Sequence, residues 1–124
     1  MGSSLRVMVV DDDDLVRRIT ARLLARAGHE VVQVGSGEAA IALYDQGAKI
    51  DLLLTDGRMP GLSGRQVAQV LQSRDPSLRV LFTSGYAADP TLGLQPGDAF
   101  IAKPFTGDQL AQAIAELFST PGHQ

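Results

Sequence analysis

The sequence predicts a single α/β domain in which a five-stranded parallel sheet carries helices on both faces. Apolar, strand-like segments alternate with amphipathic segments of helical length along the 124 residues. The run Leu52-Leu53-Leu54 has no polar alternation, as expected for a strand that is covered on both faces. Polar signals directly follow four of the apolar runs, the position at which open α/β sheets bind ligands. A chain of this length suits one domain.

Punctuating residues set the expected bounds of these elements. Ser36 is suited to cap the second helix, Gly28 and Gly47 end the first and second helices, and Pro76 prevents continuation of the third. The expected strands cover residues 5–10, 31–34, 51–55, 78–83 and 99–102, and the expected helices cover 14–27, 36–46, a segment ending near 74, and 106–118. The apolar stripes expected to face the core are Leu15, Ile19, Leu23 and Ala27 in the first helix and Leu110, Ala113, Ile114 and Leu117 in the last.

The segment between the fourth and fifth strands is expected to differ from the rest. Two prolines and two glycines between residues 87 and 97 disfavour a continuous helix, by about 1 kcal/mol for each Gly and ~3 kcal/mol for each interior Pro. We therefore expect a short or irregular fourth helix, the least ordered part of the domain. A dimer formed through that helix is disfavoured for the same reason, and we expect a monomer.

Composition excludes several classes of protein. The chain has no cysteine, so it can form neither a disulfide nor a thiolate metal site, and cytoplasmic residence fits. No apolar stretch approaches the ~20 residues that a spanning helix needs. The net charge of −3 gives no reason to expect nucleic-acid binding. Residues 1–4 are expected to be a disordered leader or the remnant of an expression tag, and residues 120–124 a flexible tail.

The four polar signals predict one site. They are Asp11-Asp12 after Val9-Val10, Asp56 after the Leu-rich run, Ser84 after Leu81-Phe82-Thr83, and Lys103-Pro104 after Phe100-Ile101-Ala102. The carboxyl ends of parallel strands meet at one edge of the sheet, so these side chains should converge. Three carboxylates, a hydroxyl and an ammonium at one place suit a divalent cation and a phosphoryl group.

The acidic run Asp11 to Asp14 has two explanations. A helix N-terminus favours negative charge, which accounts for Asp13 and Asp14. Asp11 and Asp12 follow a buried strand, and two like charges at ~4 Å repel by about 4 kcal/mol at an effective dielectric of 20. Adding Asp56 increases the repulsion unless a cation binds, and carboxylates suit a hard ion such as Mg²⁺. A calcium loop is excluded, because its alternating acids, Gly and terminal Glu are missing.

Each remaining site residue also has a functional and a simpler interpretation. Asp56 can attack phosphorus as a carboxylate nucleophile, or it can cap a turn. Ser84 can donate its hydroxyl to a phosphoryl oxygen, or it can be a turn residue before Gly85. Lys103 can give a phosphate a point charge, or it can be solvated. Turn and cap roles do not explain why all the signals occur together.

Four segments, VMVVDDD, LLLTDGRMPGLSG, VLFTSGYA and FIAKPF, resemble in order and spacing the receiver domain of two-component response regulators. The resemblance runs from about Arg6 to Phe118 and implies a receiver domain over residues 5–119. It implies a flavodoxin-like, doubly wound fold. It also implies a switch that takes a phosphoryl group from a histidine kinase or histidine phosphotransfer protein, and that catalyses only its own phosphorylation and dephosphorylation.

The resemblance also assigns the metal ligands. Asp12, Asp56 and the main-chain carbonyl of Arg58 would hold Mg²⁺, and Asp11 would act mainly through a water. The bond between Lys103 and its following proline would be cis, which would aim the ammonium into the site.

Two further pairs have family roles. Ser84 and Phe100 match the hydroxyl and the aromatic residue that respond on activation, although Phe100 can equally be a core aromatic. Arg58 and Tyr86 occupy the positions that flank the route of the hydrolytic water, so they would set the lifetime of the aspartyl phosphate. Neither can be a general base, because Arg stays protonated and the reference pKa of Tyr is ~10.

Two other classes of protein share some of these features. A haloacid-dehalogenase-type phosphohydrolase uses the same groups, but its nucleophile follows the first strand in a DxDxT motif, whereas Leu15-Val16 stand where that Thr is needed. A pseudo-receiver would have lost site residues that are intact here.

The weaker features are a GxGxxA match at residues 35–40, which a Ser36 cap explains, Arg18 and Arg22 as a docking face, and the lone His29 and His123. The chain ends soon after the last expected helix, which fits a stand-alone regulator or a receiver from a hybrid kinase, and VLFTSGYA resembles hybrid-kinase receivers.

Overall fold

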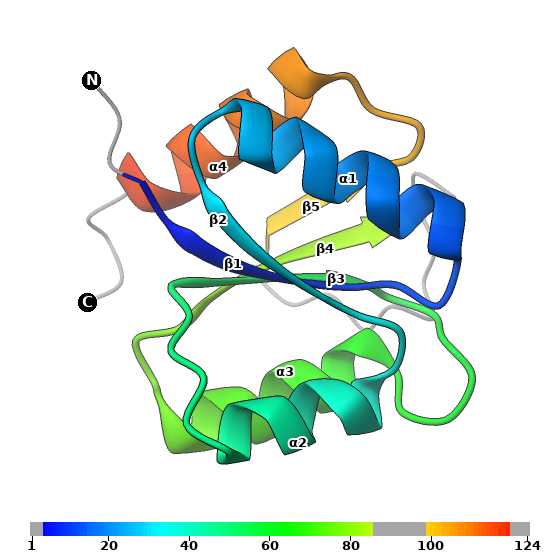
Figure 1. Ribbon diagram of the computed structural model, residues 1–124, viewed down its shortest axis with the longest axis vertical. Coiled ribbons are helices and arrows are strands. Elements are labelled where there is room, and N and C mark those ends of the chain that lie inside the picture. Colours follow the sequence, from blue (N-terminus) through cyan, green and yellow to red (C-terminus); the bar gives the residue numbers. More distant parts are fainter. Residues whose placement is uncertain (1–3, 86–98, 120–124) are drawn as a thin grey trace.

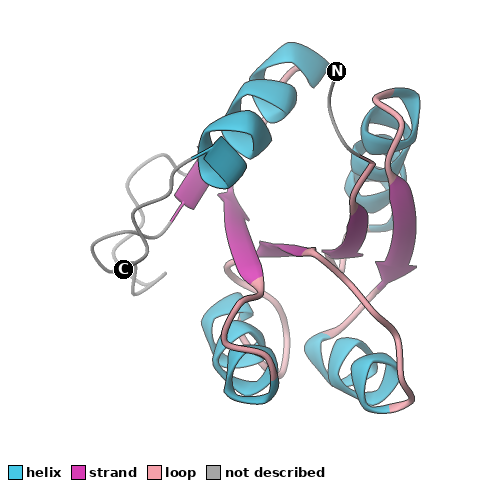
Figure 2. Cartoon of the chain, turned by 90° about the vertical axis from the view of Figure 1, so that its left-hand side faces the viewer, coloured by secondary structure: helices cyan, strands magenta, loops and turns pink. Residues whose placement is uncertain are grey.

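The computed structural model describes residues 4–85 and 99–119, which form a parallel five-stranded sheet between two layers of helices (Figure 1, Figure 2). The strand order is β2-β1-β3-β4-β5. Strand β2 is added on one side of β1, and β3, β4 and β5 follow on the other side, so the strand order reverses between β1 and β3. This confirms the predicted doubly wound α/β fold. The strands are β1 (Arg6–Val10), β2 (Glu30–Val34), β3 (Leu52–Asp56), β4 (Arg79–Ser84) and β5 (Ala99–Ala102), and the helices are α1 (Asp14–Arg26), α2 (Gly37–Asp45), α3 (Gly64–Arg74) and α4 (Gly107–Ser119).

The strands place alternate side chains in two separate cores, because successive side chains of a strand point to opposite faces. Val7 and Val9 of β1 pack on the side of α1 and α4, together with Leu24 and Leu110. Met8 and Val10 pack on the opposite side, in the cluster that contains Val67 and Leu71 of α3. The apolar middle of β3 follows the same rule, since Leu52 and Leu54 belong to the first cluster and Leu53 to the second.

The predicted buried stripe of α1 is wrong. Leu15 is 67% exposed and Ile19 50% exposed, and Ala27 lies just beyond the helix on the surface. The helix instead buries Thr20, Ala21 and Leu24, and Leu23 is only partly buried. Side chains four residues apart form rows along one face of a helix. Hydrophobicity alone favours burial of the row that contains Leu15 and Ile19. The neighbouring row with Thr20 and Leu24 faces the sheet instead, and the small side chains of Thr20 and Ala21 let the helix pack closely. The predicted stripe of α4 is confirmed: Leu110 and Ile114 are buried, and Ala113 and Leu117 pack, partly buried, against the same core.

Side chains at the helix ends account for the element bounds. Asp13 caps α1, since its Oδ1 accepts hydrogen bonds from the N–H groups of Leu15 (3.0 Å) and Val16 (3.1 Å). Ser36 caps α2 as predicted, accepting from Ala39 at 3.1 Å. Gly28 after α1 has a φ of 95°, a value that suits glycine at the end of a helix. The predicted helix bounds are therefore correct to within about a turn.

The expected irregular fourth helix over residues 87–97, Tyr86 and His123 lie outside the described residues, as do residues 1–3 and 120–124. Among the helices that are described, none has the length and apolar character needed to cross a membrane.

Candidate functional site

The predicted polar residues lie at the carboxyl edge of the sheet. Asp11 directly follows β1 and Asp56 ends β3, and Val10 pairs with Thr55 in the register of these adjacent strands, so the two aspartates lie side by side. Ser84 ends β4, and Lys103 follows β5. The site therefore lies where the strand order reverses, which is the ligand-binding position of open α/β sheets.

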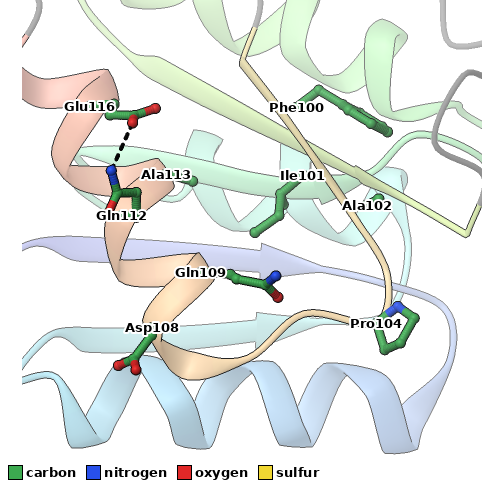
Figure 3. Close-up of a pocket in the computed structure, with 9 residues that line it drawn as sticks. All are labelled: Phe100, Ile101, Ala102, Pro104, Asp108, Gln109, Gln112, Ala113 and Glu116. Atoms are coloured by element: carbon green, nitrogen blue, oxygen red, sulfur yellow. Dashed lines mark hydrogen bonds between the residues drawn. The ribbon is translucent and has the colours of Figure 1, made fainter.

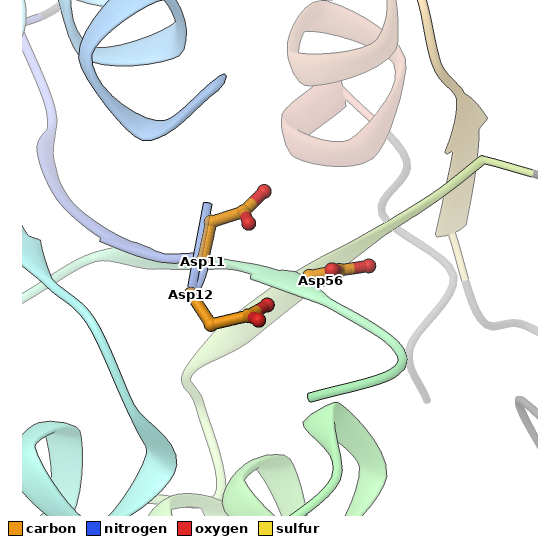
Figure 4. A group of neighbouring side chains, drawn as sticks. All are labelled: Asp11, Asp12 and Asp56. Atoms are coloured by element: carbon orange, nitrogen blue, oxygen red, sulfur yellow. The ribbon is translucent and has the colours of Figure 1, made fainter. Parts of the chain in front are cut away.

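Three carboxylates converge at this edge (Figure 4). One oxygen each from Asp11, Asp12 and Asp56 lies within 4.8 Å of the other two. Asp11 is buried, Asp56 is partly buried, and Asp12 is exposed, so the cluster is open to solvent on the side of Asp12. In the part of the chain that the structure describes, this is the one group of three or more acidic, His or Cys side chains with metal-binding geometry. Its all-oxygen donor set fits a hard divalent cation such as Mg²⁺.

The ammonium of Lys103 connects two of these carboxylates. Its Nζ lies 3.2 Å from Oδ2 of Asp11 and 3.5 Å from Oδ2 of Asp56, and its side chain is 19% exposed. The Lys103–Pro104 peptide bond is cis, as the resemblance implies. The N–H of Lys103 donates to the main-chain carbonyl of Ser84 at 2.7 Å, which joins the ends of β4 and β5.

The environment of Asp56 disfavours its ionised form. Burial raises the pKa of Asp56 above its ordinary value, and the negative charge of Asp11 raises this pKa further. The charge of Lys103 and a hydrogen bond from the backbone N–H of Arg58 oppose these effects without cancelling them. A cation bound among the carboxylates would favour the ionised form, so metal binding and the ionisation of Asp56 support each other.

Ser84 and Phe100 lie on the paired strands β4 and β5. Ser84 is buried at the end of β4 and pairs with Ala102, the residue before Lys103. Phe100 lies opposite Phe82 in the register of β4 and β5 and packs, partly buried, against the core on the side of α2 and α3. Arg58 is exposed, and the role of its carbonyl remains a prediction.

Two residues contact the site that the sequence analysis did not single out. Arg17 on α1 donates from Nη1 to the main-chain carbonyl of Asp11 at 3.0 Å. Gly64 begins α3 directly against the main chain of Asp56, and a Cβ at this position would clash with the Asp56 carbonyl oxygen. The spacing of Arg17 from Asp14 and the second glycine of GLSG, Gly64, are the sequence signals that could have indicated these contacts.

Two hollows meet the chain at Pro104, directly after Lys103. The α1 hollow, about 340 Å³, is mostly apolar and is lined by Val16, Ile19, Thr20, Lys103, Pro104 and Phe105. The α4 hollow, about 570 Å³, lies between β5 and α4, and Figure 3 shows the Gln112–Glu116 hydrogen bond on its helical wall. It is lined by Phe100, Ile101, Ala102, Pro104, Asp108, Gln109, Gln112, Ala113 and Glu116.

The weaker sequence features have structural explanations. Residues 35–40 are accounted for by the Ser36 cap of α2. Nδ1 of His29 accepts the N–H of Leu5 at 3.1 Å, which ties the start of β1 to the turn before β2. Arg18 and Arg22 are exposed on α1.

Comparison with known proteins agrees with this fold and site. The family model described as the response regulator receiver domain matches residues 7–115. The chain therefore belongs to the response regulator receiver domain family, whose members are phosphoaccepting signalling domains of two-component systems. No comparison supports the phosphohydrolase alternative.

Similar proteins include both kinases and regulators. The chain is 32% identical to the sensor kinase CckA of Brucella abortus over 121 residues, which is 94% of this chain and 13% of that protein. It is 36% identical to the transcriptional regulatory protein FixJ of Azorhizobium caulinodans over 119 residues, which is 92% of this chain and 55% of that protein. The chain thus spans about half or less of the length of these relatives.

Solved receiver structures have the same fold. A response regulator receiver protein from Sinorhizobium medicae superimposes with a TM-score of 0.83 at 32% identity, covering 95% of this chain and 97% of that one. The receiver domain of the hybrid histidine kinase CckA gives 0.77 at 33% identity, with 90% and 97% covered. The response regulator TrrA from Thermotoga maritima, in complex with Mg²⁺ and BeF, gives 0.78 at 27% identity, also with 90% and 97% covered.

Proposed function

We propose that Asp56 is the phosphoacceptor and takes a phosphoryl group from the phosphohistidine of a histidine kinase or histidine phosphotransfer protein. The observation that carries this proposal is the convergence of three carboxylates and the Lys103 ammonium where the strand order reverses. Asp56 is the carboxylate that ends the central strand β3, and its side chain is 12% exposed. A carboxylate in this position is held in place by the sheet and is still accessible to a donor.

Asp12, Asp56 and the main-chain carbonyl of Arg58 would hold Mg²⁺, with Asp11 acting mainly through a water. The oxygen donors and their spacing support this set, and an exposed Asp12 gives the ion an entry route. When bound, Mg²⁺ neutralises charge on the carboxylates and on the phosphoryl oxygens.

The transfer step needs few groups from the protein. A carboxylate oxygen of Asp56 forms a bond to phosphorus while the nitrogen–phosphorus bond of the donor breaks, and its electron pair goes to the imidazole nitrogen. The Lys103 ammonium pairs with one phosphoryl oxygen, and the Ser84 hydroxyl donates to another. The chain thereby catalyses its own phosphorylation and, with water as the acceptor, its own dephosphorylation.

The apolar face of α1 is where we expect the phosphodonor to dock. Leu15 and Ile19 are more exposed than any other large apolar side chains in the described residues, and Ile19 also lines the α1 hollow. Lys103 lines the same hollow and contacts Asp56, so a donor seated there has its phosphohistidine next to the acceptor. Exposed Arg18 and Arg22 on the same helix supply cationic groups for an acidic rim on the donor.

Phosphorylation changes a partner-binding surface through Phe100. This side chain packs against the core on the side of α2 and α3 and also lines the α4 hollow. A shift of Ser84 toward the phosphoryl group would alter the adjacent strand β5 and, with it, the wall of that hollow.

Incubation with acetyl phosphate and Mg²⁺, followed by intact-mass measurement, tests the acceptor. We expect the wild type to gain the mass of one phosphoryl group, Asp56→Asn to gain none, and the control Asp108→Asn, an exposed acid on α4, to behave as the wild type. Undiminished labelling of Asp56→Asn would overturn the assignment. A wild type that binds Mg²⁺ but is never labelled would favour the pseudo-receiver alternative.

A further inference from the structure

Arg17 connects three parts of the structure next to the carboxylate cluster. Its Nη1 donates to the main-chain carbonyl of Asp11 at 3.0 Å, and its Nη2 lies 2.7 Å from Oδ1 of Asp14. The guanidinium also lies against the turn after β2, since a Cβ on Gly35 would be 3.4 Å from Nη1. The side chain is only 15% exposed. A planar guanidinium can satisfy two acceptors at fixed angles, which a lysine ammonium cannot do.

These contacts complete the anchoring of Asp11. Its N–H donates to the carbonyl of Val34 at 3.2 Å, and its carboxylate accepts from the N–H of Asp13 at 2.9 Å and from the Lys103 ammonium at 3.2 Å. The carbonyl, held by Arg17, is the remaining polar group of the residue. Arg17 therefore restrains the one part of Asp11 that the sheet, the helix cap and Lys103 do not hold.

The restrained carbonyl belongs to the peptide unit that joins Asp11 to Asp12. A peptide unit is planar, so fixing its oxygen also fixes the direction in which the chain enters Asp12. Asp12 is exposed, so packing restrains its side chain little. The position of its carboxylate thus depends on the backbone that carries it.

We infer that Arg17 is a positioning residue for the divalent-cation site: it holds the Asp11–Asp12 peptide so that both carboxylates stay directed at Asp56. This inference rests on the proposed Mg²⁺ site. It assigns a role to Arg17 itself, which does not touch the cation. Outer groups that orient metal ligands typically contribute 10–100-fold to metal affinity.

Charge and positioning predict opposite effects when Arg17 is replaced. If Arg17 acted only as a nearby positive charge, its removal would tighten Mg²⁺ binding, because one repulsive cation would be lost. If it positions the loop, removal weakens binding. Arg17→Lys keeps the positive charge but loses the planar guanidinium that reaches two acceptors. Arg17→Met loses both the charge and the guanidinium. Arg18→Met is the matched control, since it removes the adjacent, exposed positive charge on the same helix.

The experiment measures the Mg²⁺ dissociation constant by calorimetric titration, the amide NMR shift of Asp12 in metal-free protein, and stability to urea. We expect Arg17→Lys and Arg17→Met to raise the dissociation constant about ten-fold and to shift the Asp12 amide. Arg18→Met should bind as the wild type or slightly tighter. If Arg17→Met does not fold, Arg17→Lys carries the test. Asp14→Asn adds to it, because it replaces the ion pair that holds Nη2 with a neutral acceptor, and a smaller loss is expected for this variant.

Arg17 variants that lose stability yet bind Mg²⁺ like Arg18→Met would overturn the inference and leave the cation site intact. Wild-type protein that binds no Mg²⁺, or an Asp12→Asn variant that binds it undiminished, would instead overturn the proposed site on which the inference rests.

Discussion

Lys103 and Asp11 form an ion pair across the carboxyl edge of the sheet, with 3.2 Å between Nζ and Oδ2, although they are 92 residues apart in the chain. The same ammonium lies 3.5 Å from Oδ2 of Asp56. Both carboxylates are largely withdrawn from solvent, so Lys103 offsets a repulsion that water screens poorly. The loop after β5 is thereby held against the ends of β1 and β3.

Lys103→Met should make the metal-free protein less stable and more dependent on Mg²⁺. Removing the ammonium leaves the carboxylates of Asp11 and Asp56 facing each other without a counter-charge. Because Lys103 is partly exposed, we expect the free energy of unfolding to fall by about 1–3 kcal/mol, which is below the range for fully buried pairs. Added Mg²⁺ should restore more stability to the variant than to the wild type. Urea unfolding with EDTA and with Mg²⁺ measures both, and an unchanged metal-free stability would contradict the prediction.

Asp56→Asn should raise the free energy of unfolding of the metal-free protein at neutral pH. Burial and the Asp11 charge raise the pKa of Asp56, so the folded state holds this proton more tightly than the unfolded state does. The stability that protonated Asp56 contributes is therefore fully present below the unfolded pKa, and it is lost as the pH rises through the folded pKa. The advantage of Asp56→Asn should therefore shrink as the pH falls from the raised folded pKa toward ~4, the ordinary pKa of an aspartate, and should be absent below it.

The measurement is urea unfolding of wild type and variant in EDTA across this pH range. An advantage that stays constant with pH, or a variant less stable than the wild type at neutral pH, would show that burial does not dominate the energetics of Asp56.

How much of this site the sequence could predict depends on which interactions place each residue. Asp11, Asp56 and Lys103 were predictable, because each follows an apolar strand and the carboxyl ends of parallel strands must meet at one edge. The buried row of α1 was not, since the rotation of a helix about its axis depends on close packing by small residues such as Ala21. The contact of Arg17 with Asp11 depends on that rotation and was missed for the same reason.

The exposed position of Ile19 leads to a test of donor docking. Ile19→Ser should leave stability within about 0.5 kcal/mol, because half of the side chain is already in solvent. Phosphotransfer from a phosphorylated histidine phosphotransfer protein should fall about ten-fold, since a buried apolar anchor at an interface contributes 1 kcal/mol or more. Phosphorylation by acetyl phosphate should not change, because a small donor needs no docking face.

Val32→Ser on β2 is the matched control, since Val32 is another exposed apolar side chain, at 37%, on the edge strand. Equal transfer rates for Ile19→Ser and Val32→Ser would place the docking face elsewhere.

Arg58→Ala should shorten the lifetime of the aspartyl phosphate without preventing its formation. Arg58 is exposed two positions after Asp56, its N–H donates to the Asp56 carboxylate, and its guanidinium cannot act as a base because it stays protonated. We expect it to pair with phosphoryl oxygens and to crowd the in-line approach of water, so its removal should speed hydrolysis. Tyr86, which lies outside the described residues, is predicted to screen the phosphoryl group in the same way. Intact-mass measurements over time give the decay rate of phosphorylated Arg58→Ala and Tyr86→Ala, with exposed Arg22→Ala as the control. Decay of both variants at the control rate would show that neither side chain limits the access of water.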